Sequence, residues 1–438
     1  MWLYESTIYQ IYPFGFCGAA QTNDGSSNDS HSILKTIDWV PHLQTLGANA
    51  VLFNPIFESD CHGYDTRDYT IIDQRLGTNE DFSAVCKALK AAGIRIILDG
   101  VFNHVGRGFW AFQDVLQNRQ NSRYAGWFHI SFDGNSNYND GLWYEGWEGH
   151  FELVKLNLQN PEVADYLIEC VKGWIEQFDI DGIRLDVAYC VDPNFMRRLR
   201  SFTQWMKPEF ALIGEVLFGD YNRIVNDEML HSCTNYECYK GLFSSLNDKN
   251  LFEIAHSLHR QFSGEQWSLY RGKHLMTFVD NHDVSRIASI LRDKNTLPLA
   301  YGILLGMPGV PCIYYGSEWG ELGDKNNQSD WVLRPCFDAP KPNELTAYLS
   351  TLLQARQGSK ALCYGGYHNL QISNQQLIFL REHEGEQMIV AVNIVEGATS
   401  FYNAAFRGQF ENIITGEHIS LDGNLSLSGY SVQYLRRV

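Results

Sequence analysis

The chain has 438 residues, of which 45% are apolar and 13% aromatic, and it carries a formal charge of -17. This composition supplies a large hydrophobic core and excludes intrinsic disorder, while the length fits an α/β barrel with appended parts. The negative charge, with no run of lysine or arginine, disfavours nucleic acid and anionic membrane surfaces as partners.

The N-terminal sequence MWLYESTIYQIYPFGF lacks the basic segment and long apolar stretch that mark a secretory signal. No segment reaches 18 uninterrupted apolar residues, so no membrane span is predicted. Ten cysteines are scattered singly without a CxxC pair, which favours reduced thiols over disulfides or zinc sites. Together these features predict a cytoplasmic protein.

Short apolar runs bounded by turn residues recur along the chain and alternate with helical patterns. The predicted strands are 8–13, 48–55, 94–100, 181–186, 210–215, 232–237, 275–280 and 310–315, the sixth being the weakest. Eight strands separated by helices are typical of a closed parallel (β/α)8 TIM barrel. One helix is clear at 161–178, because it begins with Pro161 and repeats apolar residues at three-to-four spacing.

Two segments interrupt this alternation. Residues 105–157, after the third strand, are rich in Asn, Gly, Asp, Trp and Tyr and are too long for an ordinary loop, so we expect a small inserted domain over the barrel mouth. Residues 363–438 alternate β-forming and turn residues without a helical period, which predicts a C-terminal antiparallel β-sandwich. The barrel would then occupy 1–104 and 158–362.

Three carboxylates lie at the ends of apolar runs, namely Asp186, Glu215 and Asp283. The C-terminal ends of barrel strands carry the active site in α/β barrel enzymes, so acids at these positions indicate carboxylate chemistry. Each acid alone could equally be the N-cap of a following helix. Their occurrence on three separate strands favours catalysis over that structural alternative.

Four ordered motifs resemble the signature regions of the α-amylase family, glycoside hydrolase family 13: DGVFNH (99–104), DGIRLD (181–186), GEV (214–216) and FVDNHD (278–283). Similar supporting segments, HGYDTRDY (62–69) and IYYGSEWG (313–320) among them, extend the resemblance over the whole barrel. LVKLNLQNPEV (153–163) is similar to the corresponding segment of cyclomaltodextrinases, neopullulanases and maltogenic amylases. The resemblance implies a retaining glycoside hydrolase that cleaves α-1,4 bonds of maltooligosaccharides or cyclodextrins, with transglycosylation as a side reaction.

Position by position, the family pattern implies that Asp186 is the nucleophile, Glu215 the general acid/base and Asp283 the carboxylate that supports the transition state. The pattern also implies a set of supporting residues: His104 and His282 for sugar hydroxyls, Tyr64 for stacking, Asp330 and Arg334 for the non-reducing side, and Arg184, oriented by Asp99, for holding Asp186 ionised. Acetal cleavage needs one charged and one protonated carboxyl. We therefore expect Arg184 to keep Asp186 charged, and the neighbouring anions to raise the pKa of Glu215.

The residues after the nucleophile bear on metal binding. Calcium-dependent relatives carry Lys-His there, whereas this chain has Ala188 and Tyr189, so we expect no cofactor to be required. A structural calcium ion is the alternative. Its candidate oxygen ligands are Asn103, which matches a family ligand, and Asp24, Asn28 and Asp29, which lack the spacing of a dedicated calcium loop.

The motifs leave other activities open. A glucanotransferase, sucrose-type phosphorylase or isomerase would keep the same chemistry with another acceptor, and Val187 also occurs in α-1,6-acting relatives. A non-catalytic glycan-binding member is a further alternative, although such proteins usually lose one or more of the three acids. Four aromatic residues could be sugar platforms or could pack locally: Trp143, Tyr144, Trp147 and Phe218. The motifs do not predict an oligomeric state.

Overall fold

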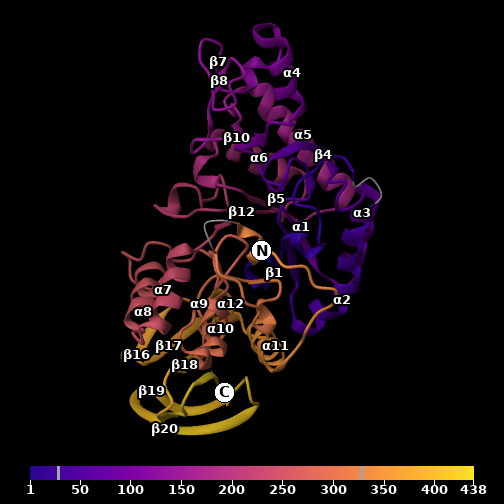
Figure 1. The fold of residues 1–438 in the computed structure, drawn as a ribbon. Coiled ribbons are helices and arrows are strands. Elements are labelled where there is room, and N and C mark those ends of the chain that lie inside the picture. The colour runs from indigo at the N-terminus through magenta and orange to yellow at the C-terminus, as the bar shows by residue number, and fades with distance from the viewer. Residues whose placement is uncertain (27–29, 326–328) are drawn as a thin grey trace.

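The computed structural model describes residues 1–26, 30–325 and 329–438, which form a barrel with attachments at opposite ends (Figure 1). The barrel strands are Ile8–Ile11 (β1), Ala50–Phe53 (β2), Arg95–Gly100 (β5), Gly182–Leu185 (β11), Ala211–Gly214 (β12), Ser232–Cys233 (β13), Met276–Phe278 (β14) and Val310–Tyr314 (β15). They pair in the order β13-β12-β11-β5-β2-β1-β15-β14, and a parallel bridge from Thr234 to Met276 closes the ring. The predicted barrel is confirmed, including its short sixth strand.

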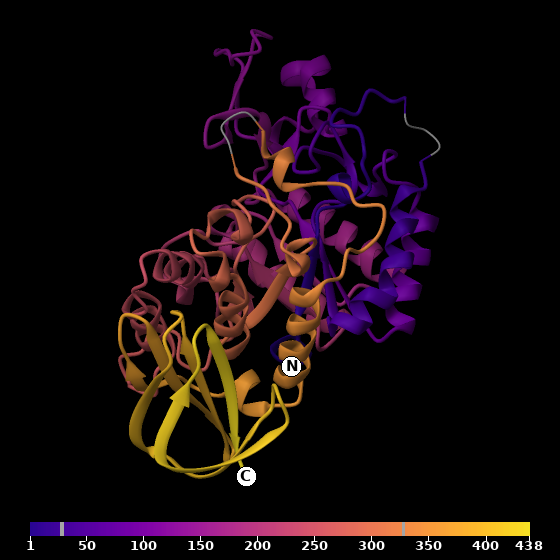
Figure 2. The ribbon, with the colours of Figure 1, turned by 60° about the horizontal axis from the view of Figure 1, so that its bottom comes forward.

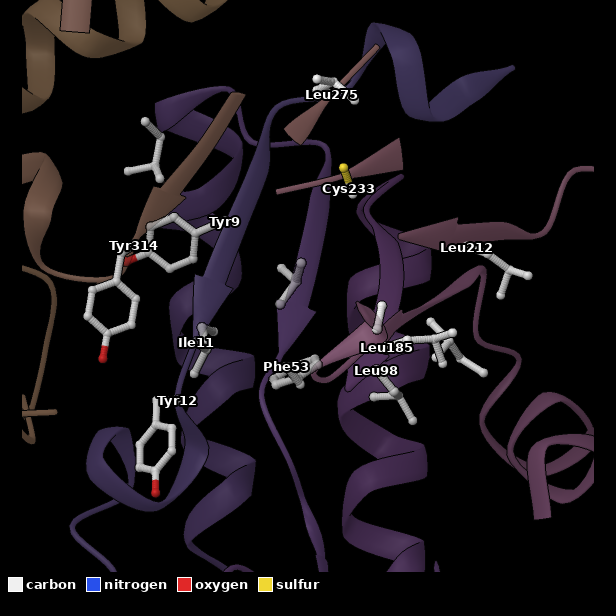
Figure 3. Packing of buried hydrophobic residues seen from close by; sticks show 14 of the residues in the cluster. Tyr9, Ile11, Tyr12, Phe53, Leu98, Leu185, Leu212, Cys233, Leu275 and Tyr314 are labelled. Atoms are coloured by element: carbon white, nitrogen blue, oxygen red, sulfur yellow. The ribbon is translucent and has the colours of Figure 1, made fainter. Parts of the chain in front are cut away.

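Helices surround the barrel and bury its outer face. They are Pro13–Phe16 (α1), Lys35–Leu46 (α2), Asn79–Ala91 (α3), Pro161–Phe178 (α5), Pro193–Met206 (α6), Tyr236–Asn247 (α7), Phe252–Phe262 (α8), Ile287–Ile290 (α9), Leu297–Gly306 (α10), Glu344–Gln357 (α11) and Lys360–Tyr364 (α12). Outward-pointing strand residues such as Ile11, Phe53 and Leu98 belong to the core beneath them (Figure 3). Within the described ranges, no helix combines the length and the apolar character that a membrane crossing requires.

Helix α5 has the bounds that the sequence predicts. Asn160 caps it by accepting a hydrogen bond from the Glu162 N–H, and Pro161 occupies the first helical position, where a missing N–H costs nothing. The predicted apolar stripe, which includes Leu167 and Trp174, is buried. The cap therefore specifies where the helix begins, and the apolar periodicity specifies which face is buried.

The expected alternation of strand and helix fails between β12 and β13. Only a 3-10 turn, Tyr221–Arg223, lies in this connection, whereas two helices follow β13. Asp220 and Asn226 accept hydrogen bonds from backbone N–H groups two and three residues ahead. Such local bonds stabilise turns at the expense of helix, so the prediction of a helix between every pair of strands is wrong here.

The segment after β5 projects from one end of the barrel (Figure 1). It contains a three-stranded sheet of His104–Gly106 (β6), His150–Lys155 (β10) and Gly146–Trp147 (β9), a pair of Ile130–Ser131 (β7) and Trp143–Tyr144 (β8), and the helix Trp110–Asn118 (α4). Pairing of β6 with β10 sets His104 opposite Lys155. Both ends of the projection thus leave the barrel together.

A second hairpin, Phe57–Ser59 (β3) with Thr66–Ile72 (β4), carries Tyr64 in its turn.

A six-stranded antiparallel sheet occupies the opposite end and curls around its own small core (Figure 2). Its strands are His368–Ile372 (β16), Gln376–His383 (β17), Glu386–Asn393 (β18), Thr399–Asn412 (β19), Glu417–Leu427 (β20) and Ser431–Arg437 (β21). Its other face packs on α10. There a Cβ on Gly302 would lie 2.6 Å from Val432, and one on Gly306 would lie 2.9 Å from Val390. The two glycines therefore set the distance between helix and sheet.

Two fully buried arginines lie near the junction of this sheet with the barrel, and one of them, Arg381, bonds across it. Arg356 of α11 donates to the carbonyls of Leu305, Met307 and Gly309, and Arg381 of β17 donates to those of Gly306, Leu362, Gly365 and Gly366. These carbonyls cluster at the C-terminal ends of α10 and α12, where the helix dipole favours positive charge. Burial lowers the pKa of both side chains. Backbone carbonyls thus solvate the two guanidinium groups inside the junction.

Candidate active site

A cavity of about 540 Å³ opens at the C-terminal ends of the barrel strands. Asp186, Glu215 and Asp283 follow β11, β12 and β14 directly or within a few residues, and all three line it. The other predicted residues on its wall are Tyr64, His104, Asp330 and Arg334. Arg184 and His282 contact the lining acids without lining the cavity themselves. The barrel thus gathers every predicted site residue around one cavity.

Arg184 lies among three carboxylates. Its Nη1 is 2.5 Å from Asp99 Oδ2 and 3.6 Å from Asp186 Oδ1, and its Nη2 is 3.0 Å from Glu215 Oε1. The guanidinium is almost fully buried, so these interactions are poorly screened by solvent. The carboxylates of Asp186 and Glu215 therefore share a single cation.

Burial raises the pKa of Glu215, as expected. Burial and the neighbouring Glu215 charge also raise the pKa of Asp186, well above its ordinary range. Arg184, 3.6 Å from Asp186, opposes this shift and favours the charged form of Asp186, although the shorter contacts of its guanidinium are with Asp99 and Glu215. Two adjacent carboxyls with raised pKa values retain one proton between them more readily than isolated acids do.

The backbone next to Asp186 orients Glu215. The Val187 N–H donates a hydrogen bond to Glu215 Oε2 at 3.1 Å. To do so, Val187 adopts φ 39° and ψ 48°, a left-handed conformation that is costly for a β-branched residue. The left-handed turn at Val187 thus directs one peptide N–H at the Glu215 carboxyl.

Asp283 is held from two sides. His282 Nε2 lies 3.0 Å from its Oδ2, and Arg334 Nη2 lies 3.1 Å from its Oδ1. Burial alone would raise the pKa of Asp283, but the neighbouring His282, Arg334 and Arg184 outweigh burial and lower it. Asp283 therefore favours its anionic form inside the cavity.

Three residues that the sequence reasoning missed support His282 and Asp99. Gln10 Nε2 lies 3.0 Å from His282 Nδ1 and donates to Asn54, and Asn54 donates to Asp99 at 3.1 Å. The Tyr12 ring stacks on the imidazole of His282 at 5.8 Å. Asn54 directly follows β2, so the rule that identified the acids, a polar residue at a strand end, could have found it.

Tyr64 and His104 lie side by side on the cavity wall. Tyr64 stacks on His282 with ring centroids 5.7 Å apart and donates to Asp99 at 3.1 Å. His104 Nε2 is 3.9 Å from Asp186 Oδ2 and has no hydrogen-bond partner among the described residues. Burial lowers the pKa values of His104 and His282 to about 3, so both rings are neutral at physiological pH.

At one side of the cavity Asp330 lies 3.6 Å from Arg334, as the Asp-x-x-x-Arg spacing suggests. Lys325, which the sequence reasoning also missed, lies 3.6 Å from Asp330 and lines the cavity. Among the four aromatic candidates, Trp147 lines the cavity with its ring 5.9 Å from that of His104. Tyr144 is buried within the projection, Trp143 is exposed, and Phe218 lines a second cleft beside Tyr189.

Two of the residues considered for calcium, Asp24 and Asn103, lie in the described part of the chain and make local contacts. The Asp24 carboxylate accepts hydrogen bonds from Ser26, and Asn103 Nδ2 lies 3.1 Å from His104 Nδ1. Asn28 and Asp29 fall outside the described residues. Over the described ranges, no three His, Cys, Asp or Glu side chains group in a way that could hold a metal ion.

Comparisons with known proteins agree with this geometry. Residues 10–334 match the family model described as the α-amylase catalytic domain. A cyclomaltodextrinase from Bacillus sp. is 30% identical over 426 residues, which cover 90% of this chain and 73% of the relative. An intracellular maltogenic amylase of Bacillus subtilis is also 30% identical, over 84% of this chain and 64% of the relative. The solved cyclic α-maltosyl-(1→6)-maltose hydrolase of Arthrobacter globiformis has a TM-score of 0.83 at 27% identity, with full coverage of both chains. The chain therefore belongs to the α-amylase family of glycoside hydrolases.

Proposed function

We propose that this glycoside hydrolase cleaves α-1,4 bonds of maltooligosaccharides and cyclodextrins with retention of configuration. The observation that carries the proposal is the convergence of Asp186, Glu215 and Asp283 on one cavity, with the first two on a single guanidinium. The names of the relatives, cyclomaltodextrinase and maltogenic amylase, support the substrate class.

In the proposed mechanism Asp186 attacks the anomeric carbon while Glu215 gives its proton to the departing glycosidic oxygen. Glu215 then accepts a proton from water, whose oxygen displaces Asp186 from the same carbon. Asp283, held anionic by Arg334 and His282, stabilises the oxocarbenium-like charge in both steps. A sugar hydroxyl in place of water would give transglycosylation.

Substrate contacts follow from the cavity wall. Tyr64 supplies a ring face and His104 supplies a neutral ring nitrogen for a hydroxyl group. His282, which the family pattern also assigns to sugar hydroxyls, lies behind Tyr64 and Asp283 and acts through them. Asp330 and Arg334 would bind the non-reducing side. The proposal includes no cofactor, because the two carboxyls and their shared proton provide the chemistry. It also includes a cytoplasmic location, which the ten free cysteines and the name of the intracellular Bacillus subtilis relative support.

A substrate panel with product identification tests the proposal. It comprises maltose, maltotriose, cyclodextrin, pullulan, isomaltose, sucrose and starch, each with and without phosphate. We expect glucose and maltose from maltotriose, and linear maltooligosaccharides from cyclodextrin. Proton NMR of the first products should show the α-anomer, whereas a β-anomer would refute retention. Glucose phosphate, or exclusive cleavage of isomaltose, would favour the phosphorylase or the α-1,6 alternative.

A further inference from the structure

Arg334 lies on a segment with little regular structure. It directly follows the 3-10 turn Asp330–Leu333 and belongs to no helix or strand. Yet its guanidinium makes defined contacts with Asp283 Oδ1, with the His282 carbonyl at 3.2 Å and with the Tyr12 hydroxyl at 3.2 Å. Other parts of the chain must therefore fix the position of its backbone.

The carbonyls on both sides of Arg334 accept hydrogen bonds from buried donors. The Leu333 carbonyl accepts from Arg286 Nη2 and from the Tyr314 hydroxyl, each at 3.0 Å. The Pro335 carbonyl accepts from the Tyr315 hydroxyl at 2.8 Å. The peptide units that flank Arg334 are thus anchored before and after it.

Arg286 connects this segment to the loop of Asp283. It lies three residues after Asp283, is fully buried, and packs over the Tyr314 ring at 4.4 Å. Its Nη1 donates to the Tyr315 carbonyl at 2.8 Å and to Ser317 Oγ at 3.0 Å. Ser317 in turn donates to Asp280, which precedes Asp283. One guanidinium therefore ties together the loop after β14, the end of β15 and the segment of Arg334.

The bonding of Arg286 is a poor means of gaining stability. Its Nε has no partner among the described residues, and its other nitrogens donate to carbonyl and hydroxyl oxygens. Burying a charge this way has a desolvation cost that an apolar side chain of similar volume would avoid. A geometric role explains its presence better than a stabilising one.

We propose that Arg286 is a positioning residue that fixes Arg334 and, through it, the orientation of the Asp283 carboxylate. The inference rests on the proposed function, which places Asp283 at the reacting sugar. Loss of the anchor would let Arg334 move away from Asp283. Transition-state stabilisation would then fall more than substrate binding, because Tyr64, His104 and Asp330 still hold the sugar when the contact of Arg334 with its non-reducing side weakens.

A double-mutant cycle on maltotriose hydrolysis tests the coupling. We expect Arg286→Met to lower kcat about 10- to 100-fold, the size of effect that a displacement of about 1 Å can have, with KM within about threefold of wild type. In an Arg334→Ala background the same change should lower kcat by less than about twofold, because the residue through which it acts is gone. Losses that multiply in the double variant would overturn the inference.

Milder variants keep the test valid if Arg286→Met does not fold. Tyr314→Phe and Tyr315→Phe each remove one hydroxyl from the anchored carbonyls, and each should lower kcat several-fold. Matched controls are Arg356→Met and Tyr434→Phe, which remove buried donors to backbone carbonyls at the junction with the C-terminal sheet. The controls should lower Tm and leave kcat within about twofold. Equal kcat losses in test and control variants would show general destabilisation and refute the positioning role.

A crystal structure of Arg286→Met, or of Tyr315→Phe, gives a readout that does not need turnover. We expect Arg334 Nη2 to have left hydrogen-bond distance of Asp283 Oδ1. Retention of the 3.1 Å contact would overturn the inference. A wild-type chain inactive on every glucan would refute the proposed function, while this measurement would still decide whether Arg286 positions Arg334.

Discussion

Replacement of Arg184 by Met should abolish turnover by leaving both catalytic carboxyls protonated at neutral pH. The guanidinium lies 3.0 Å from Glu215 and 3.6 Å from Asp186. With an effective dielectric constant of about 20, Coulomb's law gives about 5 kcal/mol for each contact. Loss of this energy raises the pKa values of both carboxyls, because the cation had favoured their charged forms.

The assay is the pH dependence of kcat/KM for maltotriose. At neutral pH the variant should show less than about one thousandth of the wild-type value, and its acid limb should move to higher pH. Arg184→Lys should be intermediate, since a single ammonium cannot reproduce the two arms that contact Asp99 and Glu215. Circular dichroism verifies that each variant is folded. A folded Arg184→Met enzyme with wild-type kcat/KM and an unmoved acid limb would refute this account of the site.

Four further predictions concern the acids, the histidines, the metal and the C-terminal junction. Asp186→Asn, Glu215→Gln and Asp283→Asn should each lower kcat/KM at least about 10³-fold with Tm within a few degrees of wild type; full activity in any of them contradicts its assignment. Burial lowers the pKa of four histidines to about 3 or 4: His104, His231, His274 and His282. The unfolded chain therefore binds protons that the folded chain does not. The free energy of unfolding by urea should fall as the pH drops below about 6.5, by up to about 1.4 kcal/mol per pH unit per histidine. A free energy of unfolding that does not change with pH would count against the neutral burial of these histidines. Treatment with EDTA should leave kcat and Tm unchanged, and a loss restored by calcium would disprove metal independence. Gly302→Ala should reduce stability by about 1 to 3 kcal/mol through overlap with Val432, without changing kcat, and an unchanged Tm would show that the junction adjusts freely.

The barrel and its acids were predictable because their signals are local. An apolar run between turn residues indicates a buried strand, and an acid at its end needs no knowledge of distant residues. Helix α5 was predictable to the residue because Asn160, Pro161 and the apolar stripe specify the same start and face. Even the two-residue strand β13 lies within the weakest predicted run, 232–237.

The supporting contacts were not predictable, because they join residues far apart in the sequence. Gln10 and His282 lie on opposite halves of the chain, and only the closure of the barrel brings them to 3.0 Å. The sharing of Arg184 is of the same kind. The sequence places Arg184 two residues from Asp186 on the same strand, but it does not indicate that Asp99 and Glu215, from two neighbouring strands, make the closer contacts with the guanidinium.

Helix α10 is apolar on every side, and the C-terminal sheet covers it at the distance set by Gly302 and Gly306. Exposing a helix of this kind to water would be unfavourable. The strands after residue 367 therefore cover α10 and are structurally part of the barrel's outer layer. Truncation at this point would expose the apolar helix α10 to water. It would also remove Arg381, the donor to the Gly306 carbonyl at the end of that helix. Heating should accordingly melt barrel and sheet in one cooperative event, and shortened versions of the chain should aggregate where the intact chain stays in solution.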